Sequence, residues 1–198
     1  MAVVIGVLAL QGDVREHLAA VEKAGGVGVP VRTREEIARV DGLIIPGGES
    51  TTVGKLLDRF GLMAQVRGLP DEGKPIFGTC TGMILLAKTI EASEQPRIGV
   101  LDIAVRRNAF GRQVDSFEED LPVEGIAGGP VRAVFIRAPY VTDMRPGVQV
   151  LAAVDGHPVM VREGNLLAAA FHPELTDDVR VHQLFIAMVE RAKARREP

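Results

Sequence analysis

The segment Lys74-Pro-Ile-Phe-Gly-Thr-Cys-Thr-Gly82 joins a short apolar run to a turn framed by glycines, and an apolar stretch, Met83 to Ile90, follows it directly. We expect residues 74–78 to form a strand buried on both faces and residues 83–90 to form a helix. The glycines at positions 78 and 82 permit the tight turn between these two elements. A buried strand that turns at once into a helix is typical of a parallel α/β sheet.

The same order of strand and helix occurs upstream of this segment. Val3–Leu10 is a near-continuous apolar run of strand length. Gly42–Pro46 is another such run, and it leads through Gly47-Gly-Glu-Ser50 into a helix expected over residues 51–60. These repeats favour a sheet of parallel strands with helices on both faces.

Two helix starts carry the spacing of a capping box. Asp13 is followed three residues later by Glu16, and Thr33 is followed three residues later by Glu36. An apolar stripe at helical spacing follows the first of these starts: Val14, Leu18 and Val21. We therefore expect a longer helix after Asp13 and a shorter one after Thr33.

The second half of the chain changes character. Four segments look like strands: Val131–Ala138, Val148–Val154, Val159–Arg162 and Leu166–Phe171. Asp155-Gly156 is a hairpin turn signal between two of them, which predicts an antiparallel or mixed extension of the sheet. An amphipathic helix over Asp178–Arg195 closes the chain. The predicted fold is α/β: a three-layer, open, mostly parallel sheet with helices on both faces, of the flavodoxin-like kind, with an antiparallel extension.

Composition limits the possible functions. The 198 residues are 46% hydrophobic and 25% charged, so one globular domain over residues 1–198 is expected. A net charge of −3 gives no case for a nucleic acid or an anionic membrane as partner. No leader is visible, and no apolar run approaches the roughly 18 residues of a membrane span. A single cysteine suits a reducing compartment, so a cytoplasmic location is expected.

That single cysteine, Cys80, is either an inert core residue or a reactive thiol. Its setting, Gly78-Thr-Cys-Thr-Gly82, is the G-x-C-x-G form of a nucleophile elbow. The turn lifts the side chain above the sheet, and the helix that follows directs unpaired N–H groups at the site, which favours a thiolate and can hold an oxyanion. The framing glycines favour the nucleophile.

A thiol nucleophile needs a base, and four histidines are available. His172 directly follows the apolar strand Leu166–Phe171, and functional groups collect at the carboxyl ends of such strands. Glu174 lies two residues further on and can hold the imidazole. The remaining three are more simply explained as two helix-surface residues and one solvated turn residue: His17, His182 and His157.

The loop Gly47-Gly-Glu-Ser50 allows a ligand to approach the backbone closely, and its N–H groups can supply half of an oxyanion hole. It can also be a plain tight turn with Ser50 as helix N-cap, or a phosphate-binding turn. The spacing around Lys55 does not fit a Walker motif, and no G-x-G-x-x-G is present. No His or Cys pair has metal-ligand spacing, so neither a metal nor another cofactor is expected.

Several segments together resemble class I, triad-type glutamine amidotransferases, and among them the PdxT family, the glutaminase subunits of pyridoxal 5′-phosphate synthase. The resemblance covers essentially the whole chain. The segments that carry it are Ile5–Gly12, Val14–His17, Asp41–Thr52, Gly73–Cys80, Arg107–Phe117, Val134–Pro139 and Phe171–Thr176. Residues 107–117 are the most specific to this branch, whereas the triad motifs alone indicate only the superfamily.

The resemblance implies a Cys80–His172–Glu174 triad that releases ammonia from L-glutamine. It implies an oxyanion hole built from backbone groups of Gly47, Gly48 and Thr81. It also implies a set of glutamine-binding residues: Gly48, Glu49, Ser50, Arg107, Ile136 and Arg137. An arginine suits the substrate α-carboxylate through paired hydrogen bonds, although Arg107 and Arg137 alone would pass for ordinary surface residues.

One residue departs from the family pattern: Thr81 follows the nucleophile, where alanine is usual. Its backbone N–H remains a candidate oxyanion donor, while its hydroxyl and added bulk can alter access. The resemblance also implies a separate synthase subunit that receives the ammonia to make pyridoxal 5′-phosphate. Two alternatives stay open at this point: a glutaminase serving another acceptor synthase, and a non-catalytic interaction protein on the same fold.

Overall fold

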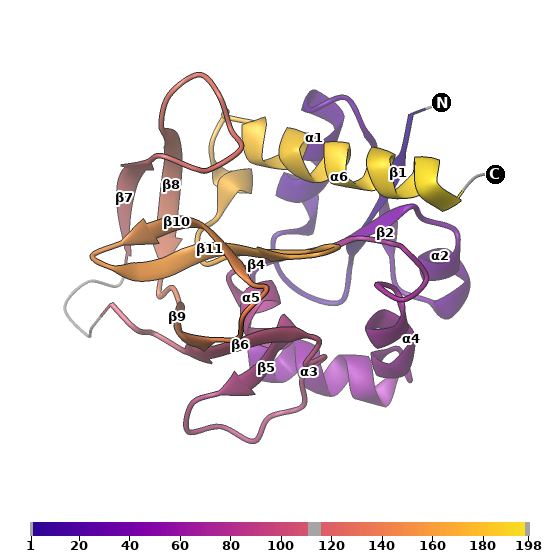
Figure 1. Ribbon diagram of the computed structural model, residues 1–198. Coiled ribbons are helices and arrows are strands. Elements are labelled where there is room, and N and C mark those ends of the chain that lie inside the picture. Colours follow the sequence, from indigo (N-terminus) through magenta and orange to yellow (C-terminus); the bar gives the residue numbers. More distant parts are fainter. Residues whose placement is uncertain (1, 111–115, 197–198) are drawn as a thin grey trace.

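A seven-stranded sheet forms the centre of the computed structural model, which describes residues 2–110 and 116–196 (Figure 1). The strand order is β10-β11-β12-β4-β3-β1-β2. The strands, in chain order, are β1 (Val4–Leu8), β2 (Val27–Val31), β3 (Gly42–Ile45), β4 (Ile76–Thr79), β10 (Gln149–Val154), β11 (His157–Glu163) and β12 (Leu166–Ala169). The five strands from β12 to β2 run parallel, whereas β11 is antiparallel to both of its neighbours. The predicted mostly parallel sheet with an antiparallel extension is confirmed, but one of its predicted strands is misplaced. Val131–Ala138 corresponds to β8 (Val131–Ile136), which pairs with β7 (Ser116–Leu121) in a separate sheet and is not part of the extension.

Helices cover both faces of this sheet. Helices α1 (Val14–Lys23) and α6 (Arg180–Arg196) lie together on one face, while α3 (Ser50–Arg59) and α5 (Thr81–Leu86) lie on the other (Figure 1). The shorter helical elements are α2 (Arg34–Ala38), α4 (Met63–Gly68) and the 3₁₀ turn η1 (Pro173–Leu175). Among the described residues, none of the helices is long and apolar enough to cross a membrane.

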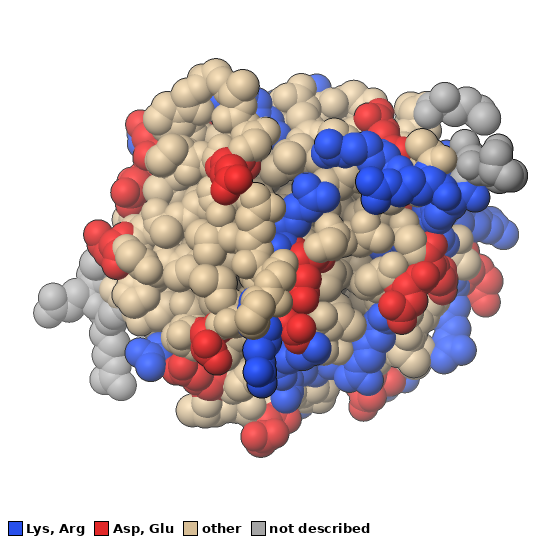
Figure 2. Space-filling view, viewed as in Figure 1, with Lys and Arg blue, Asp and Glu red and all other residues tan. Residues whose placement is uncertain are grey.

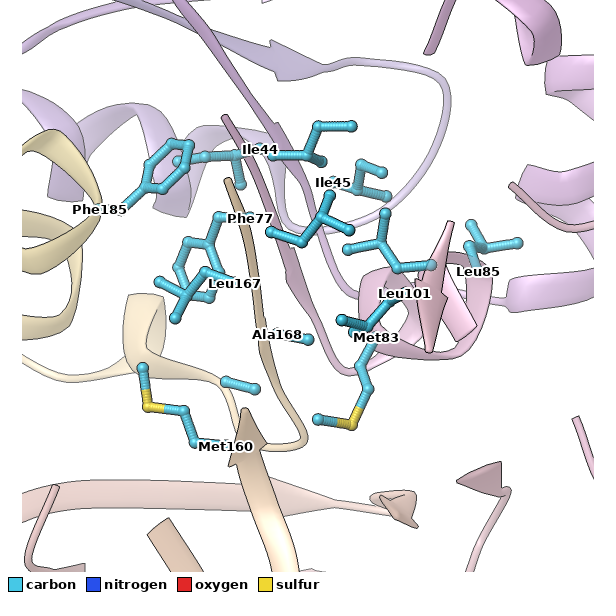
Figure 3. Packing of buried hydrophobic residues seen from close by; sticks show 14 of the residues in the cluster. Ile44, Ile45, Phe77, Met83, Leu85, Leu101, Met160, Leu167, Ala168 and Phe185 are labelled. Atoms are coloured by element: carbon cyan, nitrogen blue, oxygen red, sulfur yellow. The ribbon is translucent and has the colours of Figure 1, made fainter. Parts of the chain in front are cut away.

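The core is built where neighbouring strands place side chains in register. Phe77 of β4 lies beside Ile44 of β3 and Leu167 of β12, and its ring is 5.5 Å from that of Phe185 on α6 (Figure 3). All four side chains are fully buried. Burial of each such side chain contributes about 1.5–3 kcal/mol. The opposite face of the same strands packs against α5, including Met83, so β4 and its carboxyl end lie between two layers of helices (Figure 3).

Two smaller sheets were not predicted. The first contains β5 (Ala87–Ile90), β6 (Leu101–Arg106) and β9 (Tyr140–Met144), and the second pairs β7 (Ser116–Leu121) with β8 (Val131–Ile136). The predicted helix over residues 83–90 is therefore wrong in its second half. The helix ends at Leu86 and the chain extends at Ala87, with φ −60° and ψ 138°.

One of the two predicted capping boxes is confirmed. The Thr33 hydroxyl accepts from the Glu36 N–H at 3.2 Å, and the Glu36 carboxylate accepts from the Thr33 N–H at 3.1 Å. The box predicted for Asp13 and Glu16 is wrong, because Asp13 precedes α1 but its side chain makes no cap hydrogen bond. Its carboxylate points instead toward the candidate site described below.

Surface charge is mixed, and basic side chains gather over the C-terminal end of α6 (Figure 2). Lys193 lies 3.0 Å from Asp41, and Arg196 lies 3.7 Å from the other oxygen of that carboxylate. The positive charge at this end of the helix is therefore partly neutralised by Asp41. Cations at a helix C-terminus also interact favourably with the helix dipole.

Candidate active site

Cys80 stands at a sharp turn between β4 and α5. Its backbone φ is 48°, which is uncommon for a residue other than glycine. The turn is held from both sides, because the Cys80 N–H donates to the carbonyl of Ala169 at 2.8 Å and the Cys80 carbonyl accepts from the Ile84 N–H at 3.2 Å. Strain maintained in this way is typical of a functional site and fits the predicted nucleophile elbow.

The two framing glycines are required by close packing. A Cβ at position 78 would lie 2.4 Å from the carbonyl carbon of Gly82, and a Cβ at position 82 would lie 2.3 Å from the carbonyl oxygen of Ile45. Both distances are shorter than any real Cβ contact. The G-x-C-x-G spacing therefore lets α5 begin directly against β3 and β4.

His172 follows β12 and lies at the same edge of the sheet as Cys80. Its ring Nδ1 is 2.7 Å from Oε1 of Glu174, and its backbone N–H donates to the carbonyl of Val134 at 2.8 Å. Asp13 Oδ2 lies 3.4 Å from the same Nδ1. The predicted His172–Glu174 pairing is present in this geometry, and Asp13 is an additional acidic neighbour that the sequence did not reveal.

The charges around His172 favour its protonated form. Burial lowers its pKa, but hydrogen bonding to Cys80 and Glu174, together with their charges, outweighs burial and raises the pKa of His172 to about 10. Burial raises the pKa of Glu174, and the hydrogen bond and charge of His172 oppose that rise. His172 can therefore pair with a thiolate and hold a proton ready for a leaving group.

A cavity of about 480 Å³ opens in front of Cys80, Thr81 and His172. The predicted glutamine-binding residues all line it: Gly48, Glu49, Ser50, Arg107, Ile136 and Arg137. Gly47 lies behind this lining, where a Cβ would come 2.5 Å from Cε1 of His172. Part of the branch-specific segment, residues 111–115, lies outside the described residues.

Glu49 has a structural task in addition to lining the cavity. Its carboxylate accepts from the N–H groups of Thr51 and Thr52 at 3.0 and 2.7 Å, so Glu49 is the N-cap of α3, in place of Ser50. The Thr52 hydroxyl also donates to it at 2.7 Å and is the main cause that lowers the pKa of Glu49 to about 2. The carboxylate is thus fixed and anionic.

Gln95 connects two of the predicted substrate-binding residues. Its Oε1 accepts from Arg107 Nη1 at 2.9 Å and from the hydroxyls of Ser50 and Thr51 at 3.3 Å. This amide holds the arginine against the start of α3. Gln95 lies in a loop without a recognisable motif, so no sequence signal identified it.

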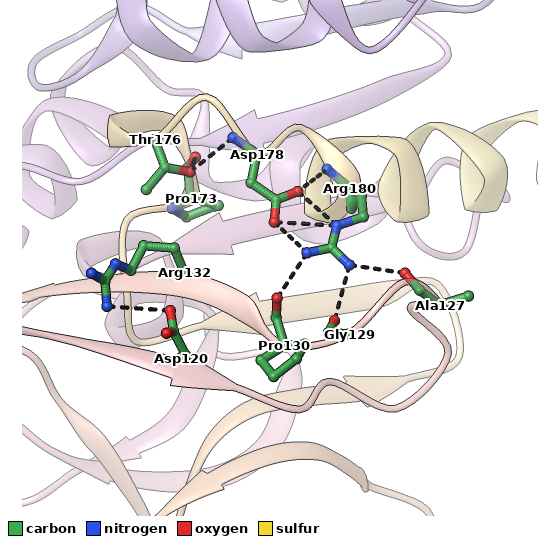
Figure 4. Close-up of polar contacts among 9 residues, drawn as sticks. All are labelled: Asp120, Ala127, Gly129, Pro130, Arg132, Pro173, Thr176, Asp178 and Arg180. Carbon is green, nitrogen blue, oxygen red and sulfur yellow. Dashed lines mark hydrogen bonds and ion pairs between the residues drawn. The ribbon is translucent and has the colours of Figure 1, made fainter.

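The loop that carries His172 is anchored beyond Glu174 (Figure 4). The Thr176 hydroxyl donates to the carbonyl of Pro173 at 3.3 Å and accepts from the Asp178 N–H at 3.2 Å. Arg180 pairs with Asp178 at 2.6 Å. Arg180 also donates to three backbone carbonyls in the loop before β8: those of Ala127, Gly129 and Pro130. These contacts limit movement of η1 and thereby of the triad candidates.

The predicted oxyanion loop has defined backbone orientations. The Gly47 carbonyl accepts from the Asp13 N–H at 3.1 Å, and the Glu49 N–H donates to Oε1 of Gln11 at 2.9 Å. The hydroxyl of Thr81 donates to the Gly48 carbonyl at 2.6 Å. Thr81 therefore links the elbow directly to the glycine loop.

We expect Thr81→Ala to lower the glutamine turnover number by no more than about tenfold, which corresponds to about 1.4 kcal/mol of activation free energy. The substitution removes one buried hydrogen bond, worth about 0.5–1.5 kcal/mol net, and leaves the backbone N–H in place. Steady-state ammonia release measures the effect. Thr81→Ser keeps the hydroxyl and serves as the control. A larger loss in the alanine variant would mean that Thr81 takes part directly in the chemical steps.

Both histidines assigned to helix surfaces, His17 and His182, are buried, so that prediction is wrong. His17 on α1 is fully buried and His182 on α6 is 1% exposed. Nδ1 of His17 lies 2.9 Å from Nε2 of His182. Burial lowers the pKa of His17 well below its usual range, and burial also lowers the pKa of His182 to about 4. Both imidazoles are neutral at neutral pH.

Because the pKa of His182 is lower in the folded protein than its ordinary 6.5, its contribution to stability is present above pH 6.5 and is lost as the pH falls through about 4. We expect wild type to lose on the order of 3 kcal/mol of unfolding free energy over this window relative to His182→Gln, which does not titrate. Urea denaturation from pH 7 to 4 measures the difference. His17, the titratable group that lies 2.9 Å from His182, is common to both proteins. Parallel pH curves would contradict the prediction.

Taken together, the elbow, the histidine at an adjacent strand end and its buried carboxylate have the arrangement that a cysteine hydrolase on an open α/β sheet requires. The chain belongs to the SNO glutamine amidotransferase family, which it matches over residues 7–191. The family resemblance inferred from the sequence is confirmed.

Individual relatives agree with this assignment. Pyridoxal 5′-phosphate synthase subunit PdxT of Carboxydothermus hydrogenoformans is 58% identical over 93% of this chain and 97% of that protein. The protein of the same name from Streptomyces coelicolor is 56% identical over 96% of each chain. A crystal structure of a glutamine amidotransferase superposes with a TM-score of 0.90 at 52% identity, covering 94% of this chain and 98% of the other. PurLQS from Thermotoga maritima, at 17% identity and a TM-score of 0.69, covers 98% of this chain and 99% of its own and shares the fold.

Proposed function

We propose that this protein is the glutaminase subunit of a pyridoxal 5′-phosphate synthase and that it hydrolyses L-glutamine to L-glutamate and ammonia through Cys80, His172 and Glu174. One observation carries the proposal: Cys80 and His172 line one cavity, and Glu174 holds Nδ1 of His172 at 2.7 Å. The name of the relatives that are 56–58% identical to this chain supports the choice of synthase.

The reaction proceeds by acyl transfer. The Cys80 thiolate attacks the Cδ carbonyl of glutamine and forms a C–S bond, while the negative charge moves to the carbonyl oxygen. Backbone N–H groups at Thr81 and in the Gly47-Gly48 loop bind this oxyanion. When the tetrahedral intermediate collapses, the C–N bond breaks and His172 gives its proton to the departing ammonia.

Hydrolysis of the γ-glutamyl thioester completes the cycle. Neutral His172 removes a proton from water, the hydroxide adds to the thioester carbonyl, and the C–S bond breaks. Glutamate leaves, and the pair of Cys80 thiolate and protonated His172 is restored. Glu174 stays ionised throughout and stabilises the imidazolium.

Fixed charges in the cavity suit the two ends of the amino acid. Arg107 and Arg137 offer guanidinium groups for the α-carboxylate. The Glu49 carboxylate, held anionic by its capping bonds, suits the α-ammonium. Gly48, Ser50 and Ile136 complete the wall of the glutamine site.

Ammonia is useful for synthesis only when it is captured before it is protonated and diffuses away. We therefore propose that the whole of residues 1–198 acts as one glutaminase domain beside a separate synthase subunit, in the cytoplasm, and that activity depends on the partner ordering the oxyanion loop. No nucleic acid or membrane has a role in this scheme.

A glutamine-analogue diazo-ketone tests the proposal, because it alkylates a cysteine nucleophile only within a working glutamine site. We expect one adduct on Cys80 by peptide mass spectrometry, in the presence of the synthase subunit, together with protection by excess glutamine. If no adduct forms on Cys80 when the synthase subunit is present, the proposal that this protein is a glutaminase is wrong. A different result is also informative: Cys80 is labelled, but the unlabelled protein and the synthase subunit together form no pyridoxal 5′-phosphate. That result would mean that the ammonia goes to another acceptor.

A further inference from the structure

A buried pair of histidines lies directly behind the triad, on the side away from the cavity. His17 Nε2 is 3.5 Å from Oε2 of Glu174 and 3.0 Å from the hydroxyl oxygen of Thr79, the last residue of β4. On its other side, His17 Nδ1 is 2.9 Å from Nε2 of His182. The polar chain thus runs from His172, which lines the cavity, through Glu174 and His17 to the buried His182.

The Glu174 carboxylate needs a second donor. Its Oε1 is served by His172, whereas its Oε2 is buried and makes no hydrogen bond within the part of the chain that the structure describes. Nε2 of His17 lies 3.5 Å from that oxygen. A buried anionic oxygen without a hydrogen-bond donor is costly in free energy. The stability of the Glu174 carboxylate therefore depends on whether His17 Nε2 carries a proton.

The hydrogen-bond geometry fixes that protonation state. A neutral imidazole has one N–H donor and one acceptor nitrogen. If His17 carries its proton on Nδ1, it must donate to His182 Nε2, and the N–H at Nδ1 of His182 is then buried without a partner among the described residues. In that arrangement a bare His17 nitrogen also faces the Glu174 carboxylate oxygen, which is repulsive.

The other arrangement avoids both conflicts. His182 donates from Nε2 to Nδ1 of His17, and His17 carries its proton on Nε2, between Thr79 and Glu174. Of the four nitrogens of the two imidazoles, one acceptor, Nδ1 of His182, then has no partner among the described residues, and a buried unused acceptor is less costly than a buried unused N–H. The low pKa values that burial gives both histidines agree with two neutral rings.

We propose that His17 is a positioning residue for the glutaminase reaction: its protonated Nε2, oriented by His182, donates to the Thr79 hydroxyl at 3.0 Å and faces the second oxygen of Glu174 at 3.5 Å, and this contact keeps that carboxylate ionised and aligned on His172. The inference rests on the proposed function, since the alignment matters only if His172 transfers protons for Cys80. Neither His17 nor His182 lines the cavity in front of Cys80. Their effect reaches the reaction through the two groups that His17 Nε2 faces, Glu174 and the hydroxyl of Thr79.

Substitution at His17 should therefore reduce the rate of chemistry and leave glutamine binding nearly unchanged. We expect His17→Leu to lower kcat about 10- to 100-fold, the range seen for outer partners of metal-ligating histidines, with KM within about threefold of wild type. His17→Gln can place an amide N–H at the Nε2 position and should recover most of kcat. His17→Asn reaches only the Nδ1 position and should stay low.

Val21→Ala is the matched control. Val21 lies one helical turn after His17 on α1 and is fully buried, so its truncation destabilises the same helix without touching Glu174. We expect kcat of this variant within about twofold of wild type. Equal losses of kcat in Val21→Ala and His17→Leu, or equal kcat in the Gln and Asn variants, would overturn the positioning role. Should His17→Leu fail to fold, the Gln and Asn pair decides.

The tautomer can be measured without reference to activity. Long-range ¹H–¹⁵N correlation spectra of protein labelled at histidine should show His17 and His182 as neutral rings protonated at Nε2. A proton on Nδ1 of His17 would overturn the proposal even if the enzyme is active. Failure of wild type to release ammonia would count against the proposed function instead, and would leave this spectrum to decide the contact itself.

Discussion

Cys80→Ala is expected to abolish ammonia release from glutamine, with kcat at least about 10⁴-fold below wild type. The variant keeps the cavity, His172 and the backbone donors, but it has no atom that can form a bond to the Cδ carbonyl. Water attacking directly would use only the remaining binding and oxyanion contacts. Ammonia release should be assayed with the synthase subunit present, because turnover is proposed to depend on the partner ordering the oxyanion loop.

The fold of this variant serves as its control. Alanine at φ 48° carries the same type of backbone strain as cysteine, and Cys80 is only 8% exposed, so the thermal midpoint should change by a few degrees at most. Cys80→Ser adds a second comparison, because its hydroxyl fits the site but ionises far less readily than a thiol. Turnover in Cys80→Ala within tenfold of wild type would exclude Cys80 as the nucleophile.

The triad candidates could be predicted because each depends on local sequence. Cys80 lies between glycines whose positions are fixed by packing against β3 and α5, and that requirement leaves a visible spacing. His172 directly follows the buried strand β12, and the ends of neighbouring parallel strands meet at one edge of the sheet. Glu174 is only two residues further on. Neither step needs knowledge of distant contacts.

Residues that act through tertiary contacts were not predictable in this way. His17 and His182 are 165 positions apart and meet only because α1 and α6 pack on the same face of the sheet. A weak signal did exist: His17 lies at helical spacing from Val14 and Val21, on the apolar stripe of α1. A histidine on that stripe is expected to be buried and to need a hydrogen-bond partner. The sequence pattern of α1 alone does not identify the partner residue.

The misassigned helix shows a different limit. Residues 83–90 are mostly apolar, with Lys88 and Thr89 as the exceptions, and such a short run does not distinguish a buried helix from a strand. The chain leaves the helix at Ala87 because β5 pairs with β6, whose partner β9 is 50 residues further along the sequence than β5. Pairing with distant strands decides the outcome there, and local pattern cannot report it.

Gly82→Ala is expected to have the largest effect on stability, lowering the unfolding free energy by about 3 kcal/mol or more. The added Cβ would lie 2.3 Å from the Ile45 carbonyl oxygen, and a backbone atom of a central strand cannot move aside cheaply. For a chain of this size the thermal midpoint should fall by about 6–12 °C. Calorimetry and urea denaturation measure the two quantities independently.

Gly68→Ala is the control, because it adds the same methyl group at the end of α4 with only the Glu72 side chain nearby, at 3.9 Å. We expect it to be neutral or to stabilise by up to about 1 kcal/mol, since alanine has the higher helix propensity. Stability of Gly82→Ala equal to this control would mean that α5 can move away from β3 at little cost. The elbow would then not be held by packing, and the position of Cys80 would have to be fixed by its hydrogen bonds to Ala169 and Ile84 alone. If packing does hold it, the folded fraction of Gly82→Ala should also turn over glutamine more slowly, because the shift that relieves the overlap displaces the nucleophile from His172.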